Sequence, residues 1–184
     1  MILAALGLFF YNQQEAAAAD RSVTALLPEL RTQIESNQSS GRESGAVTDP
    51  YSLEMDTLSV EGHDYIGYLM IPKLGIEMPI MSDWSMEKLR IAPTRYTGSV
   101  NGSDLVLMGH NYDRGFGQLP KMELGDEVYF RDVTGVVTAY QVVAKDILSA
   151  DSVEEMVSGE YDMTLFTCTY GGRDRLTIRC DRIV

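Results

Sequence analysis

Short runs of β-branched, aromatic and aliphatic residues recur along the last two thirds of the chain. Glycine and proline separate these runs at intervals of about a dozen residues. Such spacing is typical of an antiparallel β-sandwich or barrel, and not of alternating βαβ units. The predicted strands are Tyr65–Ile71, Ile76–Met81, Leu105–His110, Glu127–Arg131, Val136–Ile147, Met163–Cys168 and Arg175–Ile183.

Helical periodicity is confined to the first part of the chain and to two short segments. The pattern predicts an N-terminal helix over Glu15–Ser36, interrupted only by Pro28. Its apolar residues at helical spacing are Val23, Leu26, Leu27, Leu30 and Ile34. Short helices are expected at Trp84–Ile91 and Ser152–Val157, where a small polar residue can cap the free amides.

The segment Asn37–Pro50 is polar, rich in glycine and serine, and aperiodic, as flexible connectors are. We therefore expect three parts: a hydrophobic stretch over residues 1–14, the helix and connector over 15–58, and a compact β-domain over 59–184.

An unbroken apolar run, Met1–Tyr11, begins the sequence. It is shorter than the roughly 20 residues that a membrane-spanning helix needs, and no basic residue precedes it. We interpret the run as the end of a signal-anchor whose start is missing. The first turns of a soluble helix, or the apolar core of a signal peptide, are the alternatives.

Composition excludes several classes of protein. A chain of 184 residues is long enough for one domain with a sizeable core, and 45% apolar residues exclude wholesale disorder. With 15 basic and 27 acidic residues, the net charge of −12 argues against a nucleic-acid partner. The two cysteines are too few for a disulfide framework and lack the paired spacing of a zinc site.

Cys168 is the candidate nucleophile. It ends a predicted strand and precedes a glycine-containing turn, Tyr170-Gly171-Gly172, so it would be presented at a rim. Arg173 and Arg175 follow the turn, and their charge would favour a thiolate and bind a developing oxyanion. On composition alone, a buried structural cysteine is the alternative.

His110 is the candidate acid–base group. It follows an apolar strand in the segment Leu105–Leu119, and a cysteine nucleophile at neutral pH usually needs an imidazole partner. A hydrogen-bonded surface histidine is the alternative, and the spacing leaves open whether His110 and Cys168 meet. The other histidine, His63, lies before the first strand and is expected to be a surface group.

Taken in order, six segments of the sequence resemble the sortases, the cysteine transpeptidases of Gram-positive cell surfaces. The resemblance covers the chain from about residue 60 to 184. The segments are Gly67–Ile80 (GYLMIPKLGIEMPI), Gly109-His110, Phe116–Leu119 (FGQL), Gly125-Asp126, Thr164–Cys168 (TLFTC) and Arg175-Leu176.

This resemblance implies an all-β fold, an eight-stranded closed barrel with short helices and an N-terminal helix, whose groove holds a Cys, a His and an Arg. The family pattern assigns Cys168, His110 and Arg175 to these places. Arg173 follows the same turn and competes with Arg175, and Arg179 is a third candidate on the same strand face. We expect Arg173 and Thr167 to contact substrate.

The implied reaction is acyl transfer. Cys168 would attack the threonine carbonyl of an LPxTG-like sorting signal, His110 would protonate the departing amine, and Arg175 would stabilise the oxyanion. An amine of a cell-wall peptide or of a pilin lysine would then resolve the thioester. The resemblance also implies an enzyme on the extracellular face of the membrane, held there by its N-terminus. No cofactor or metal is needed for this chemistry. The acidic stretch Asp146–Asp162 lies where some sortases bind calcium, but such stretches are more often solvated.

The subclass stays open on sequence. Asp49-Pro50-Tyr51 resembles the Asp-Pro-aromatic lid of pilin-polymerising, class C, sortases, although a Pro-aromatic pair in a linker is usually only a turn. Class C enzymes usually carry a C-terminal hydrophobic anchor, and none precedes Val184. The N-terminal helix and anchor resemble class B, yet the connection Ile147–Met163 is too short for the long helix found there.

Two other functions are alternatives to a transpeptidase. A sortase-like barrel could bind a sorting signal without turnover, but all three catalytic residue types are present. A papain-like hydrolase would carry its cysteine early and its histidine late, the reverse of the order of His110 and Cys168. The remaining candidates are assigned to packing: Cys180 to the core face of its strand, and Trp84 to the core or the groove lining.

Overall fold

The computed structural model describes residues 2–39 and 54–183, with side chains from residue 13 onward. The predicted segment Asp49-Pro50-Tyr51 lies outside the described residues. The elements are α1 (Ile2–Ser39), β1 (Leu58–Val60), β2 (His63–Ile71), η1 (Pro72–Leu74), β3 (Ile76–Met81), η2 (Lys88–Arg90), β4 (Thr94–Thr97), β5 (Leu105–Met108), η3 (Phe116–Lys121), β6 (Glu127–Asp132), β7 (Val137–Ser149), α2 (Val153–Met156), β8 (Met163–Cys168) and β9 (Asp174–Arg182).

The strands form a closed barrel. Eight of them follow one another around it in the order β2-β3-β4-β5-β8-β9-β7-β6, and β6 pairs back onto β2. β1 lies outside this ring and pairs with β2 beyond the stretch that β6 occupies. The all-β, eight-stranded closed barrel predicted from the sequence is therefore confirmed.

Two pairings in the barrel are parallel, β3 with β4 and β5 with β8, whereas the strand spacing predicts an antiparallel sandwich or barrel. That prediction was wrong at these two places because the neighbours are not joined by short turns. The hairpin of β6 and β7 lies between β5 and β8 in the chain, and β8 then enters the barrel beside β5. The parallel pair is important for the site described below.

Gly67 allows the barrel to close. A Cβ atom at this position would lie 2.0 Å from the carbonyl oxygen of Arg131, and its φ of +145° is one that other residues rarely adopt. The register of β2 with β3 also shifts at this point, between Tyr65 and Gly67. The absence of a side chain therefore lets β6 pair directly with β2 where the bulge turns the strand.

The barrel interior is filled by alternate residues of the strands. On β9, Leu176, Ile178 and Cys180 all point into this core. Cys180 is fully buried, and burial raises its pKa to about 12, so its prediction as a core residue is confirmed.

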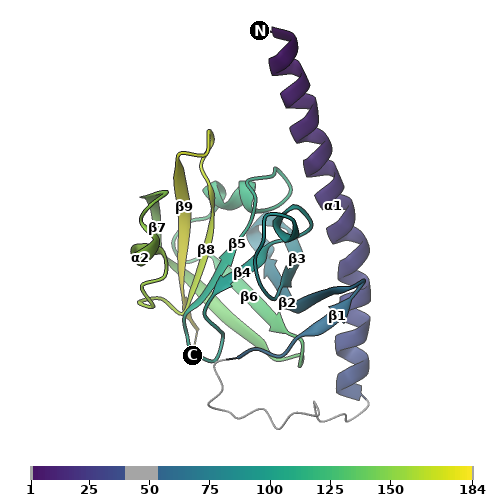
Figure 1. Cartoon of the computed structure of the whole chain (residues 1–184). Coiled ribbons are helices and arrows are strands. Elements are labelled where there is room, and N and C mark those ends of the chain that lie inside the picture. The colour runs from purple at the N-terminus through teal and green to yellow at the C-terminus, as the bar shows by residue number, and fades with distance from the viewer. Residues whose placement is uncertain (1, 40–53, 184) are drawn as a thin grey trace.

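Helix α1 lies along the outside of the barrel, and its N-terminal part extends beyond the barrel (Figure 1). Leu26, Leu30 and Ile34 recur every four residues and are buried against β2 and β3, where they pack with Tyr65 and Met81. The helix is longer than the predicted Glu15–Ser36 because it continues into the apolar run. No helix in the described ranges has both the length and the apolar character needed to cross a membrane.

Several other elements differ from the sequence predictions. The short strands β1 and β4 were not predicted, nor was the 3-10 helix η3. Of the expected helix Trp84–Ile91, only η2 forms a regular turn. The expected helix at Ser152–Val157 is present as the single turn of α2.

Candidate active site

The three residues predicted to be catalytic line one cavity. His110, Cys168 and Arg175 border a space of about 320 Å³ between the ends of β5, β8 and β9. Thr167 also borders it. The fold thus brings together side chains that are 58 and 7 residues apart along the chain.

Parallel pairing places His110 beside Cys168. Met108, the last residue of β5, pairs with Phe166 of β8, and the Gly109 amide donates a 3.1 Å hydrogen bond to the Phe166 carbonyl. Parallel neighbours end at the same edge of a sheet. His110 and Cys168, each two residues beyond this pair, therefore lie at one rim of the barrel.

Thr167 holds this rim together. Its buried hydroxyl donates a 2.8 Å hydrogen bond to the carbonyl of Gly109, directly before His110. The hydroxyl is therefore engaged with the backbone of the neighbouring strand, and the predicted substrate contact of Thr167 stays a prediction.

Antiparallel pairing places Arg175 opposite Cys168. The two are partners in the register of β8 and β9. Nη1 of Arg175 donates 3.1 Å hydrogen bonds to the carbonyls of Gly172 and Asp174, so the side chain folds over the turn that joins the strands. Cys168 and Arg175 are both partly exposed, and Cys168 is a free thiol.

The other two arginines are placed differently. Arg173 is exposed in the turn and is not among the described residues that line the cavity. Arg179 is 4% exposed and donates hydrogen bonds to the carbonyls of Glu155 (2.7 Å) and Met156 (3.0 Å) and to the Thr164 hydroxyl (2.9 Å). Arg179 thus links α2 to β9 through hydrogen bonds. Arg175 is the arginine that lines the cavity.

His110 is largely enclosed, and burial lowers the pKa of its imidazole below the ordinary value. Two charges act on it in opposite directions: Glu15 of α1 raises the pKa, and Arg90 of η2 lowers it. The ring stacks on Tyr112, with centroids 4.9 Å apart. Neutral imidazole is thus favoured in the free protein, as an acid–base group at neutral pH requires. His63, by contrast, begins β2 and is not among the described residues of the cavity.

The rest of the cavity wall is apolar and aromatic. Trp84 is 46% exposed and lies against Tyr96, with ring centroids 5.8 Å apart, and Tyr96 meets Phe166 edge to face at 5.4 Å. Val153 and Met156 of α2 border the space from another side. Trp84 is therefore groove lining. No sequence signal singled out Tyr96 or Val153, because an apolar residue in a cavity wall has the same local pattern as one in the core.

Two carboxylates of the acidic stretch Asp146–Asp162 form polar contacts with residues of β9. Asp146 forms an ion pair with Arg179 at 4.0 Å, and Asp162 accepts a 2.7 Å hydrogen bond from the Arg182 amide. Within residues 2–39 and 54–183, no group of three or more His, Cys, Asp and Glu side chains is arranged to hold a metal ion.

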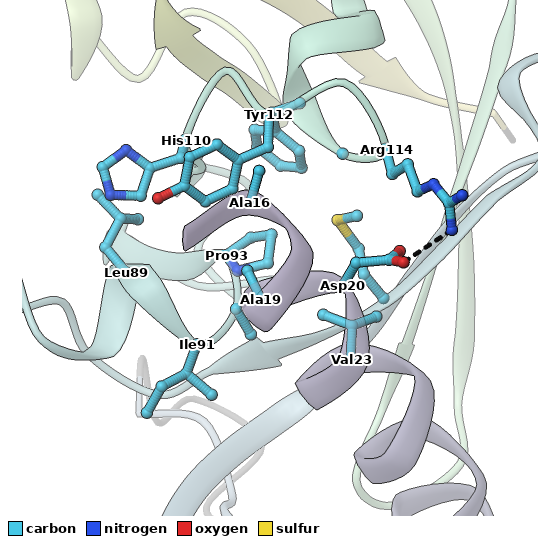
Figure 2. Close-up of a pocket in the computed structure, with 14 residues that line it drawn as sticks. Ala16, Ala19, Asp20, Val23, Leu89, Ile91, Pro93, His110, Tyr112 and Arg114 are labelled. Carbon is cyan, nitrogen blue, oxygen red and sulfur yellow. Dashed lines mark hydrogen bonds and ion pairs between the residues drawn. The ribbon is translucent and has the colours of Figure 1, made fainter. Parts of the chain in front are cut away.

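Helix α1 lies close to His110, across a small cavity that is separate from the one lined by Cys168. No sequence signal indicated this contact. A second, small cavity of about 50 Å³ lies between α1 and the loop after β5, and His110 borders this one too. Figure 2 shows Ala16, Ala19 and Val23 of α1 on one side of it and His110 on the other.

Comparisons with known proteins agree with this geometry. The family model described as "Sortase domain" matches residues 69–183. Sortase C1 of Streptococcus suis is 29% identical, with a TM-score of 0.57 over 66% of this chain and 74% of that one. Sortase C1 of Streptococcus agalactiae, in complex with MTSET, is 27% identical, with a TM-score of 0.59 over 91% of this chain and 90% of that one. A Clostridium perfringens sortase D5 transpeptidase is similar in fold, with a TM-score of 0.64 at 17% identity over 91% and 99% of the two chains. No curated protein matches the chain.

Proposed function

The chain belongs to the sortase family, and we propose that it is a cysteine transpeptidase that cleaves an LPxTG-like sorting signal and joins the released protein to an amine. The observation that supports this most directly is the shared cavity of His110, Cys168 and Arg175. Their positions on three neighbouring strand ends supply a nucleophile, an acid–base group and a cation to one small space.

In the first half of the reaction, neutral His110 takes the proton of the Cys168 thiol, and the resulting thiolate attacks the carbonyl carbon of the threonine in the sorting signal. The carbonyl π electrons move to oxygen, and Arg175 stabilises the resulting oxyanion. The C–N bond then breaks, and protonated His110 gives its proton to the departing amine. The product is a thioester between Cys168 and the threonine.

In the second half, an amine attacks the thioester carbonyl. Neutral His110 takes the proton of the incoming amine, and the Cys168 sulfur leaves as thiolate. A new amide bond replaces the thioester, and His110 returns its proton to the Cys168 thiolate, which restores the starting state of the enzyme. The amine comes from a cell-wall peptide or a pilin lysine.

The apolar wall of the cavity suits the first residues of such a signal. Trp84, Tyr96, Val153 and Met156 present aromatic and aliphatic surface beside Cys168. A leucine and a proline would bury apolar area there.

We also propose that the protein acts on the extracellular face of the cell membrane, held by its N-terminal segment. The apolar beginning of α1 extends beyond the barrel, so it can reach a membrane (Figure 1).

The test is mass spectrometry of the full chain mixed with a panel of sorting-signal peptides, plus oligoglycine or a lysine-bearing pilin peptide. We expect a thioester adduct on Cys168 and a ligated product. Cys168→Ala should give neither, and Cys180→Ala, altered only in the core, should give both.

Peptide binding without an adduct, measured by isothermal calorimetry with wild-type protein, would overturn the proposal. It would instead favour a sortase-like barrel that binds sorting signals without turnover. Thioester adducts that hydrolyse without forming a ligated product would support cleavage of the sorting signal and contradict its transfer to an amine.

A further inference from the structure

His110 has two different surroundings. One side of the residue faces the cavity with Cys168 and Arg175, and the other faces the small cavity under α1. Leu89, next to Arg90 in η2, borders both spaces. The proposed acid–base group is thus sandwiched between substrate and the N-terminal helix.

Helix α1 brings two carboxylates to this region, and each faces an arginine. Glu15 Oε1 lies 3.6 Å from Arg90 Nε, and Asp20 Oδ2 lies 2.8 Å from Arg114 Nη1. The Asp20–Arg114 pair is drawn in Figure 2. Arg90 belongs to η2 and Arg114 to the loop that carries His110, so α1 is tied to both elements that flank the imidazole.

These carboxylates are held by a firmly docked element. The burial of Leu26, Leu30 and Ile34 fixes α1 on the barrel about three to five turns beyond Glu15. A charge on a packed helix is more accurately placed than one on a loop.

Charged and titratable groups from several elements surround His110. They are Glu15 and Asp20 of α1, Arg90 of η2, Tyr112 and Arg114 of its own loop, Cys168 of β8 and Arg175 of β9. Of these, Glu15 and Arg90 act on the imidazole with opposite signs. Exposed ion pairs add little to the free energy of unfolding. A contribution to stability therefore does not account for the ion pair between Glu15 and Arg90.

We propose that Glu15 is a positioning residue of the active site, whose charge offsets that of Arg90 beside His110, so that docking of the N-terminal helix sets the protonation of the acid–base group. The proposal rests on the proposed function, in which His110 moves the proton. In this proposal α1 contributes to catalysis through Glu15, in addition to linking the barrel to the N-terminal segment.

The test is an NMR titration of the full chain with ¹³C-labelled histidine, following the ring Cε1–H signals of His63 and His110. His63→Gln assigns the two signals. Glu15→Gln should shift the His110 midpoint to lower pH, and Arg90→Gln should shift it to higher pH. The double variant should lie between them. Glu35→Gln, an exposed carboxylate further along the same helix, is the matched control and should leave the midpoint unchanged.

The His63 signal and the unfolding midpoint of each variant show whether the fold is intact. A His110 midpoint in Glu15→Gln equal to that in Glu35→Gln would overturn the proposal, as would shifts of the same sign in Glu15→Gln and Arg90→Gln. The titration needs no substrate, so its outcome is independent of the proposed reaction. Failure of the wild type to form a thioester would count against the reaction alone.

The same variants give a kinetic readout. The limb of the pH profile of kcat/KM that reports His110 should move in the direction of its titration midpoint in both Glu15→Gln and Arg90→Gln. A merely structural role of Glu15 would lower the rate at all pH values and leave the limb in place.

Discussion

Arg175 stands directly opposite Cys168 in the antiparallel register of β8 and β9. Side chains in this relationship lie on one face of the sheet, within contact of each other. If Arg175 stabilises the oxyanion, Arg175→Ala should lower the rate of thioester formation by about 10²–10³-fold. Arg175→Lys should recover only part of it, because lysine lacks the planar fork of donors. Stopped-flow or quenched mass spectrometry with a sorting-signal peptide measures both.

Arg173→Ala is the matched control, since this residue occupies the same turn but not the cavity wall. We expect it to retain most of the activity. A large loss in Arg173→Ala with little loss in Arg175→Ala would reverse the assignment of the two arginines.

The two cysteines should differ sharply in reactivity. Cys168 is partly exposed at the cavity, whereas Cys180 is in the core with a pKa raised to about 12 by burial. Since the thiolate is the reactive form, iodoacetamide should modify Cys168 alone in the folded protein and both cysteines in urea. Peptide mapping of the labelled protein locates the adducts. Labelling of Cys180 at a rate similar to that of Cys168 without denaturant would contradict the structure.

Thr167 links the strand of the nucleophile to the loop of the histidine. In Thr167→Val the Gly109 carbonyl loses its 2.8 Å donor inside the protein, which should reduce the free energy of unfolding by about 1–3 kcal/mol. Thioester formation should fall as well, because His110 follows Gly109. Thr167→Ser should restore both, while the same change at an exposed strand residue, Thr97→Val, should alter neither. Urea denaturation and the peptide assay check this. Full activity in Thr167→Val would show that the bond does not position His110.

How much of the structure could be predicted from the sequence depends on how far apart along the chain the interacting residues lie. Alternation along β9 was enough to place Leu176, Ile178 and Cys180 in the core. The motif resemblance was enough to assign His110, Cys168 and Arg175 to one groove. Alternation and motif segments are local patterns, each set within a few residues along the chain.

Longer-range relationships were not predictable in this way. The parallel pairing of β5 with β8, which puts His110 beside Cys168, joins strands separated by the whole β6–β7 hairpin. The contact of Glu15 with Arg90 spans 75 residues and depends on how α1 docks. No periodicity in a single sequence encodes such a docking angle. Short strands such as β4 were missed because they carry too few residues to show alternation.

Arg179 should affect substrate binding through the α2 turn. Its guanidinium holds the carbonyls of Glu155 and Met156, and Met156 borders the cavity. Arg179→Met leaves both carbonyls without this donor, and the bond to Met156 is a buried one, so we expect a loss of about 1–3 kcal/mol in unfolding free energy. The KM for the peptide should rise more than kcat falls, because the catalytic residues keep their places. Arg21→Met, on the exposed side of α1, is the control. A lowered kcat with unchanged KM would place Arg179 in the chemistry.

Stability should depend on pH through His110. Burial lowers the pKa of this histidine in the folded protein, while the unfolded chain has the ordinary value of about 6.5. As pH falls through that value, the unfolded state binds a proton that the folded state does not yet accept, so folding stability is lost on the acid side. His110→Gln lacks this contribution. The excess stability of wild type over His110→Gln should therefore decline between pH 8 and pH 5 in urea denaturation experiments. His63→Gln controls for the loss of a histidine as such. Parallel curves for wild type and His110→Gln across this range would mean that the imidazole titrates alike in both states, and that α1 and η2 do not enclose it.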